Sequence, residues 1–168
     1  DSSYLRACVS TVAVAAASQK KKVIVAVIST VLPGTVGREI KPVLNEWTSL
    51  VYNPSFIAQT SAIRDYLHPE FVLLGVDDPA AADVVREYYA TITSASVCEM
   101  SVASAELCKV AYNVFLGIKI VVANAVMQVA HEVGADCDDV TNALTKATDR
   151  VVSARYMRGG MGDGGPCH

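Results

Sequence analysis

Lys109 and Asn113 are the residues of this sequence whose types and spacing most clearly suggest chemistry. They lie four residues apart, so on a helix both would project from one face. The surrounding stretch, residues 101–133, is apolar on nearly all sides, and a lysine is rarely buried in such a helix without a task. A cation and an amide donor one turn apart can stabilise negative charge that develops on a single oxygen. The simpler interpretations are an ion pair of Lys109 with Glu106 and a loop-capping role for Asn113.

A glycine-rich segment near the end of the sequence is the second feature of interest. Half of the ten glycines lie in residues 159–165, so this segment is either a loose end or a tight loop where backbone approaches a ligand. Its G-x-G-x-x-G match neither follows a strand nor opens a helix, so we reject it as a dinucleotide fingerprint. The five cysteines include no C-x-x-C pair and indicate neither a disulfide framework nor a zinc site. We therefore expect a reducing, cytoplasmic setting and no metal.

The elements that must position these residues alternate between strands and helices. The run at 23–28 is continuously apolar and β-branched, the pattern of a strand covered on both faces of a parallel sheet. Alternation over the first hundred residues indicates a parallel α/β layer. Strands are expected at 23–28, 50–52, 71–75 and near Ser96, and helices at 5–17, 36–45, 79–89, 101–133 and 140–147. Thr35, Pro79, Gly134 and the aspartates of 136–139 are predicted to mark helix ends.

The charge pattern excludes two classes of partner. The formal net charge is −3 and basic residues are dispersed apart from the triplet at 20–22, so neither nucleic acid nor an acidic membrane is indicated. Lys119 stands at the centre of the apolar helix, where a lysine costs about 2.5 to 3.5 kcal/mol on membrane-insertion scales. We therefore expect a soluble protein. Because the sequence has no initiating methionine and stops directly after the glycine-rich segment, we expect it to be a piece of a longer protein.

Four separated motifs, taken in order, resemble the NAD-dependent nucleotide-sugar dehydrogenases of the UDP-glucose/GDP-mannose dehydrogenase family. The motifs are S-T-V-L-P-G-T at 29–35, N-P-x-F at 53–56, A-E-L-x-K-x-x-x-N at 105–113 and G-x-G-G-P-C at 162–167. Asp65 and the pair Asp149-Arg150 also stand where this family has them. Each pattern alone is weak, but their order and spacing make the set specific, and the resemblance covers essentially the whole chain.

The resemblance implies an α/β fold in which the C-terminal half of a Rossmann-like parallel sheet is followed by a long central dimerisation helix and a small helical segment. Residues 1–98 would form the second half of an N-terminal NAD-binding domain whose glycine fingerprint is absent. Residues 99–168 would form the central helical region, which ends in the catalytic-cysteine loop. A homodimer through the 101–133 helix is implied as well.

The resemblance also implies a reaction, the oxidation of a sugar C6 alcohol of a nucleotide sugar to a carboxylate with NAD. Cys167 would be the nucleophile, forming a thiohemiacetal that collapses to a thioester. Lys109 and Asn113 would stabilise charge on the C6 oxygen, and Thr30 would order an active-site water. Ser29 and Thr30 would also contact the cofactor. The residues implied for substrate binding are Phe56, Arg150, Tyr156, Gly162, Gly164 and Gly165.

The sequence departs from the family at one motif. The usual pattern is Asn-Pro-Glu-Phe-Leu-x-Glu-Gly, and here Ser55 and Gln59 replace the glutamates while Thr60 replaces the glycine. The first glutamate is usually assigned to thioester hydrolysis, so that step would lack its carboxylate. Two alternatives remain: a non-catalytic dimerisation module, and a β-hydroxyacid-type dehydrogenase, which also carries Lys-x-x-x-Asn on an interdomain helix but needs no thiol.

Overall fold

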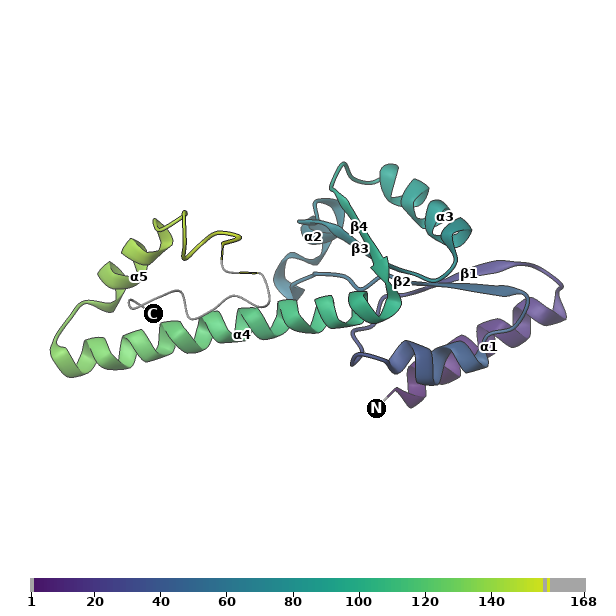
Figure 1. Cartoon of the computed structure of the whole chain (residues 1–168), viewed down its shortest axis with the longest axis horizontal. Coiled ribbons are helices and arrows are strands. Elements are labelled where there is room, and N and C mark those ends of the chain that lie inside the picture. Colours follow the sequence, from purple (N-terminus) through teal and green to yellow (C-terminus); the bar gives the residue numbers. More distant parts are fainter. Residues whose placement is uncertain (1, 156, 158–168) are drawn as a thin grey trace. The chain divides into compact units, whose positions relative to one another are not determined.

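The computed structural model describes residues 2–155 and 157, which fall into two compact units, 1–114 and 115–168. The first unit holds a four-stranded sheet and its helices; the second holds the remainder of the long helix and a short helix after it (Figure 1). The elements are α1 (Ser3–Ser18), β1 (Val23–Val27), η1 (Val36–Ile40), η2 (Lys41–Val43), β2 (Thr48–Tyr52), η3 (Gln59–Ser61), α2 (Ala62–Leu67), β3 (Val72–Val76), α3 (Pro79–Ala90), β4 (Val97–Ser101), α4 (Val102–Val133) and α5 (Cys137–Thr145).

The sheet has the strand order β1-β2-β3-β4 and is mixed. β1 runs parallel to β2 and β3 runs parallel to β4, whereas β2 and β3 are antiparallel, with Val51 opposite Val76. The predicted α/β class is confirmed, but the expectation that every strand is parallel is wrong at this central pair. The reason is the connection: after β2 the chain forms an extended segment, η3 and the short α2, and it returns as β3 from the end where β2 stopped.

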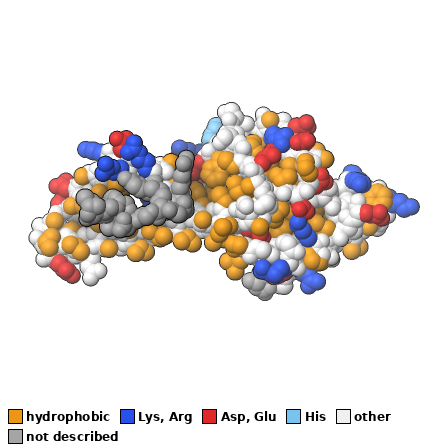
Figure 2. All heavy atoms as spheres, viewed as in Figure 1, with side chains coloured by type: hydrophobic (Ala, Val, Ile, Leu, Met, Phe, Trp, Pro, Cys, Tyr) orange, Lys and Arg blue, Asp and Glu red, His pale blue; other side chains and the backbone are white. Residues whose placement is uncertain are grey.

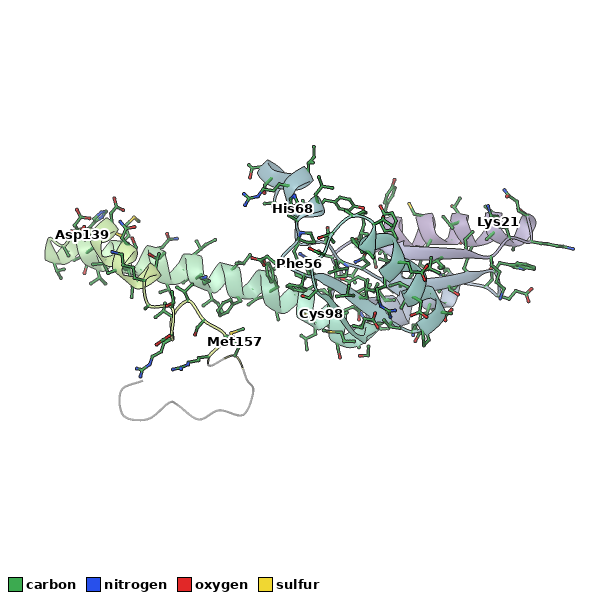
Figure 3. All side chains as sticks on the ribbon, turned by 90° about the horizontal axis from the view of Figure 1, so that it is seen from above. Lys21, Phe56, His68, Cys98, Asp139 and Met157 are labelled. Carbon is green, nitrogen blue, oxygen red and sulfur yellow. The ribbon has the colours of Figure 1, made fainter. Side chains whose placement is uncertain are left out.

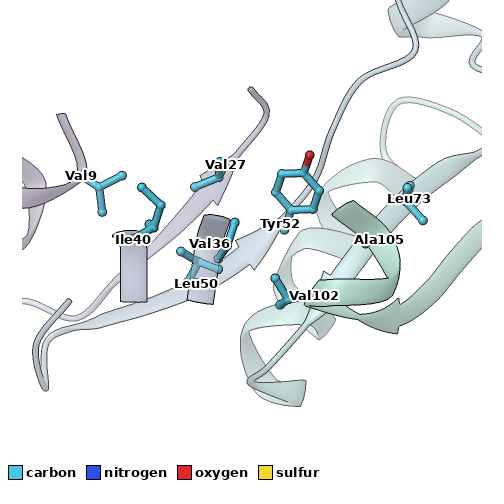
Figure 4. Close-up of a cluster of buried hydrophobic side chains, with 9 residues drawn as sticks. All are labelled: Val9, Val27, Val36, Ile40, Leu50, Tyr52, Leu73, Val102 and Ala105. Atoms are coloured by element: carbon cyan, nitrogen blue, oxygen red, sulfur yellow. The ribbon is translucent and has the colours of Figure 1, made fainter. Parts of the chain in front are cut away.

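Alternating residues of β2 and β3 face two separate hydrophobic clusters. On one face, Leu50, Tyr52 and Leu73 pack with α1, η1 and the first turns of α4; Figure 4 shows this cluster. On the other face, Val51, Val72 and Leu74 pack against Ala81 and Val85 of α3.

β1 is an edge strand of the described sheet and is covered on one face only. Val27 is buried, but Ile24, Ala26 and Ile28 are exposed, because α3 packs against β2 and β3 and leaves β1 uncovered. The prediction that both faces of the 23–28 strand are covered is therefore wrong for the residues that the structure describes.

The predicted helix ends are partly confirmed. Asp78 caps α3 ahead of Pro79, Gly134 ends α4 with a φ of 70°, and Asp136 accepts hydrogen bonds from the amides of Asp138 and Asp139 at the start of α5. Thr35 does not act as a cap: its own backbone is helical and its side chain makes no capping hydrogen bond.

Two of the predicted helices differ from those in the structure. The helix expected at 36–45 is η1 followed by the three-residue η2, since Pro42 lacks the amide that a continuing helix needs. α5 begins earlier than expected because Asp136 caps it. The last strand, predicted near Ser96, is confirmed at Val97–Ser101. η3 and α2 were not predicted, because they are too short to show helical periodicity.

The long helix α4 changes character along its length. Val102, Ala105, Glu106 and Lys109 are buried, whereas residues 113–125 are all exposed in this chain. Figure 2 shows hydrophobic side chains gathered along the exposed part of α4. Among the described residues, α4 is the one helix long and apolar enough to cross a membrane, a test of length and composition that core helices of soluble proteins also pass.

Gly75 of β3 should tolerate no side chain, because α4 approaches the sheet there. A Cβ at this position would lie 3.0 Å from the Val102 Cα, 3.0 Å from the Ala105 Cβ and 3.1 Å from the Tyr52 Cβ. We expect Gly75→Ala to lower the free energy of unfolding by about 1–3 kcal/mol through overpacking, measured by urea denaturation. Gly37→Ala is the control, since a Cβ there meets nothing within 4 Å. Equal stability of the two variants would contradict the close packing of α4 on β3.

Candidate functional site

The side chain of Lys109 is almost completely buried and rests against aromatic rings. It is 6% exposed, and its Nζ lies 4.4 Å from the centroid of the Phe56 ring and 5.7 Å from that of Tyr112. The ammonium donates to Oδ1 of Asn113 at 3.4 Å, and Asn113 itself is exposed. Burial lowers the pKa of Lys109 from its ordinary value. The rings therefore hold a cation beside an exposed amide, the arrangement that could stabilise charge on a substrate oxygen.

Phe56 reaches Lys109 because the segment after β2 is firmly held. The amide of Asn53 donates to the carbonyl of Val27 at 2.8 Å, and its side chain donates to the carbonyl of Leu73 at 3.1 Å. Its Oδ1 accepts from the hydroxyl of Tyr89 at 2.7 Å. Asn53 is 5% exposed, so these bonds satisfy a buried amide and fix the N-P-S-F motif at the end of the strand.

Aromatic packing then orients the Phe56 ring, which lies beside the first half of α4 (Figure 3). Its centroid is 4.6 Å from that of Phe71 and 4.6 Å from that of Tyr112. Tyr112 donates a hydrogen bond to Glu70 at 3.1 Å, and burial, with this partner, raises the pKa of Tyr112. Sequence reasoning missed Tyr112; the signal was its spacing, because a residue three positions after Lys109 shares its helix face.

Glu106 is not the ion-pair partner of Lys109. Its carboxylate is 1% exposed and accepts hydrogen bonds from the amides of Gly34, at 2.6 Å, and Val36, at 2.7 Å. Gly34 has a φ of +84° and Thr35 is helical, a combination that turns nearby amides toward one anion. A carboxylate from a distant helix thus does what the Thr35 side chain was predicted to do.

The remaining predicted site residues are less closely placed. Ser29 and Thr30 are exposed in the loop after β1, and since β1 and β2 are parallel, this loop leaves the sheet at the same edge as the Phe56 segment. Arg150 is exposed in the second unit. Tyr156, Gly162, Gly164, Gly165 and Cys167 lie outside the described residues. The structure therefore brings together Lys109, Asn113 and Phe56.

The described cysteines offer no ready alternative nucleophile. Cys8, Cys98, Cys108 and Cys137 are all unpaired, and the pKa of Cys108 is raised by burial and further by the nearby Cys98. A raised pKa leaves less thiolate, which is the reactive form. No group of three or more His, Cys, Asp or Glu residues within the described part of the chain could hold a metal ion.

Because Lys109 is charged and buried, it should cost stability. We expect Lys109→Met to raise the free energy of unfolding at pH 7, because burial disfavours the charged lysine in the folded state and methionine carries no such cost. As pH rises through the lowered pKa toward 10.5, the wild-type lysine loses its proton in the folded state first, so its stability rises and the advantage of the variant shrinks.

Urea denaturation of both proteins from pH 7 to pH 10.5 measures this difference. Lys119→Met, at an exposed position of the same helix, is the matched control and should stay within about 0.5 kcal/mol of wild type. A Lys109→Met variant less stable than wild type at pH 7 would show that the aromatic rings more than offset desolvation.

Known proteins resemble this chain over most of its length. A crystal structure of a ternary complex of GDP-mannose dehydrogenase from Pseudomonas aeruginosa superposes with a TM-score of 0.89 at 28% identity, covering 94% of this chain and 38% of that one. A UDP-glucose dehydrogenase from the archaeon Pyrobaculum islandicum gives a TM-score of 0.78 at 32% identity, covering 86% and 34%. GDP-mannose 6-dehydrogenase of Pseudomonas savastanoi pv. phaseolicola is 32% identical over 151 residues, 85% of this chain and 34% of the relative.

The chain thus spans about a third of the length of the curated relatives it matches. Two family sequence models match it in succession. Residues 1–93 match the NAD binding domain of the UDP-glucose/GDP-mannose dehydrogenase family, and residues 103–168 match the central domain of the same family. These matches confirm the predicted family and its cofactor, NAD. The chain belongs to the UDP-glucose/GDP-mannose dehydrogenase family.

Proposed function

We propose that this chain is the middle part of an NAD-dependent nucleotide-sugar 6-dehydrogenase, which oxidises the C6 alcohol of a UDP- or GDP-sugar to a carboxylate. The observation that supports it most directly is the buried Lys109 ammonium beside the exposed amide of Asn113. Matches to two successive domains of the family support it over a β-hydroxyacid-type dehydrogenase. The relatives whose names indicate GDP-mannose or UDP-glucose suggest the substrate class.

The carboxyl ends of the parallel strands β1 and β2 are a suitable place for the cofactor to bind. Nucleotides bind at the carboxyl ends of parallel strands, and the exposed Ser29 and Thr30 follow β1 at that edge. NAD, when bound, supplies the hydride acceptor for both oxidations. Ser29 and Thr30 would contact it there, while Phe56, one loop away, holds the lysine that faces the substrate.

The chemistry of the chain's own residues centres on one oxygen. In the first oxidation, a water ordered by Thr30 would take the proton of the C6 hydroxyl while a hydride leaves C6. Lys109 and Asn113 would stabilise the negative charge that grows on the oxygen. The Cys167 thiolate would then attack the resulting aldehyde, forming a C–S bond while the carbonyl oxygen becomes an oxyanion held by the same pair. Loss of the second hydride leaves a thioester, which water cleaves to release the carboxylate and the thiol. Thr30 would order this water, since Ser55 offers no carboxylate.

The exposed second half of α4 supports a homodimer. Large hydrophobic side chains are exposed along it in close succession: Val114, Phe115, Leu116, Ile118, Ile120, Val121, Val122, Met127, Val129 and Val133. A contiguous row of exposed apolar side chains indicates a protein interface, and we propose a second copy of this chain as its partner, in a region that would comprise residues 99–168. The unpaired described cysteines support a reducing compartment, the cytoplasm.

The proposed reaction is tested by counting the NADH formed for each sugar oxidised. The complete protein, mixed with NAD and a panel of UDP- and GDP-sugars, should reduce two NAD for each sugar oxidised, measured by absorbance at the NADH band. Cys167→Ser should lower turnover about 1,000-fold or more and prevent the second equivalent, because nucleophile loss removes the covalent step. Cys137→Ser, at a cysteine without an assigned role, is the control. Normal two-equivalent turnover by Cys167→Ser would rule out the thioester route.

Light scattering tests the dimer. Val129→Asp places a charge on the exposed apolar face of α4 and should convert the dimer to a monomer, since an unpaired carboxylate in an apolar interface is strongly disfavoured. Val84→Asp, at a comparably exposed valine of α3, should leave the mass unchanged. A Val129→Asp protein that remains dimeric would place the interface elsewhere.

A further inference from the structure

The buried carboxylate of Glu106 has no role in the chemistry proposed above, yet it is the least exposed charged residue among the described ones. It makes no ion pair within that part of the chain, and both of its oxygens are engaged by backbone amides, Oε2 by Gly34 and Oε1 by Val36. Burying a carboxylate without a counter-ion is costly unless its oxygens are hydrogen-bonded. The amides of Gly34 and Val36 therefore offset the cost of burying this carboxylate.

What Glu106 holds is the loop between β1 and η1. The two accepting bonds, at 2.6 and 2.7 Å, are charge-assisted and short, and they join residues about 70 positions apart in sequence. The other hydrogen bonds of this segment are local: the Thr35 amide donates to the Leu32 carbonyl, the Arg38 amide to the Gly34 carbonyl, and the Arg38 side chain to the Pro33 carbonyl. Val31 packs against the hydrophobic cluster. Glu106 is thus the tie from this loop to α4.

The hydrogen bonds of Glu106 join the two parts of the chain that carry the proposed site, the loop after β1 and the first turns of α4. The loop carries Ser29 and Thr30 near its start, and Thr30 lies four residues before Gly34. On α4, Glu106 stands three residues before Lys109, one turn along the same helix. A rigid helix on one side and a short loop on the other transmit the position of one group to the other.

The packing beneath the tie adds to its rigidity. Val36 is completely buried beside Val102 and Ala105 in the same cluster, so the loop is held by its side chain as well as its amide (Figure 4). Tyr52 lies in this cluster too, its hydroxyl buried without a hydrogen-bond partner among the described groups. Burial raises the pKa of Tyr52, and the nearby Glu106 charge also raises it. Glu106 therefore sits in a compact, apolar setting where its bonds to the loop are strong.

We propose that Glu106 is a positioning residue, which sets the loop carrying Thr30 in register with Lys109 and Asn113 through its bonds to the Gly34 and Val36 amides. This inference rests on the proposed function, because Thr30 and Lys109 take their roles from it. It predicts that losing the hydrogen bonds of Glu106 lowers turnover mainly because Thr30 is displaced. Displacement of a catalytic group by about 1 Å can cost on the order of 100-fold in rate.

A double-mutant cycle in the complete protein tests the coupling. Glu106→Gln keeps size but turns one accepting oxygen into a donor that opposes a backbone amide. It should lower kcat about 10- to 100-fold with a much smaller change in the KM for the sugar. In a Thr30→Ala background the same substitution should cost no more than about twofold, because the group it positions is gone. Equal losses in both backgrounds would show that Glu106 acts on overall stability and would overturn the proposal.

Two further arms separate positioning from folding and from the reaction itself. Val85→Ala weakens the opposite cluster without touching the loop, so at matched stability it should keep wild-type kcat. Hydrogen exchange followed by mass spectrometry should show faster exchange in residues 29–36 of Glu106→Gln and no change in α3. Unchanged exchange in 29–36 would disprove the tie whatever the kinetics. If the wild-type protein oxidises no nucleotide sugar, the proposed function and the positioning role fall together, while the exchange result still decides the tie.

Discussion

The described part of the site depends on two hydrogen bonds, which two backbone amides donate to one buried carboxylate. The start of η1 offers amides that a capping side chain normally satisfies, and here Glu106 of α4 satisfies them from across the cluster. Because Val102 and Ala105 pack against β2 and β3 on the same helix turns, the carboxylate, the sheet and the loop are mutually fixed. Lys109 follows one turn later and inherits its position from that arrangement.

Lys109 illustrates a conflict between stability and chemistry. Its ammonium is removed from water and receives in return two aromatic faces and one amide oxygen, without a carboxylate partner among the described residues. A carboxylate would stabilise the cation better but would also neutralise it toward a substrate oxyanion. Aromatic rings orient the charge while leaving it available. The network behind them, from Asn53 and Tyr89 to Phe56, serves this single side chain.

The sheet explains why the helix can carry both a site and an interface. β1 and β4 lie at the two edges of the sheet, and β2 and β3 are antiparallel between them. α4 follows directly after the end of β4. Its first turns cross beside Gly75, where the absence of a Cβ permits close approach. Past Val114 the helix belongs to the second unit, where most of its large apolar side chains are exposed among the described residues. One element thus contributes a buried first part and an exposed second part.

The sequence alone determined the family, the α/β class, the 32-residue helix and the pairing of Lys109 with Asn113, because motifs, hydrophobic periodicity and i,i+4 spacing are local properties. It did not determine the antiparallel β2–β3 pair, the exposed face of β1, the aromatic setting of Lys109 or the partner of Glu106. Each of these joins residues far apart in sequence, and i,i+3 spacing allowed Glu106 to pair with Lys109 equally well. Only tertiary packing decided that its carboxylate faces the amides of a loop instead.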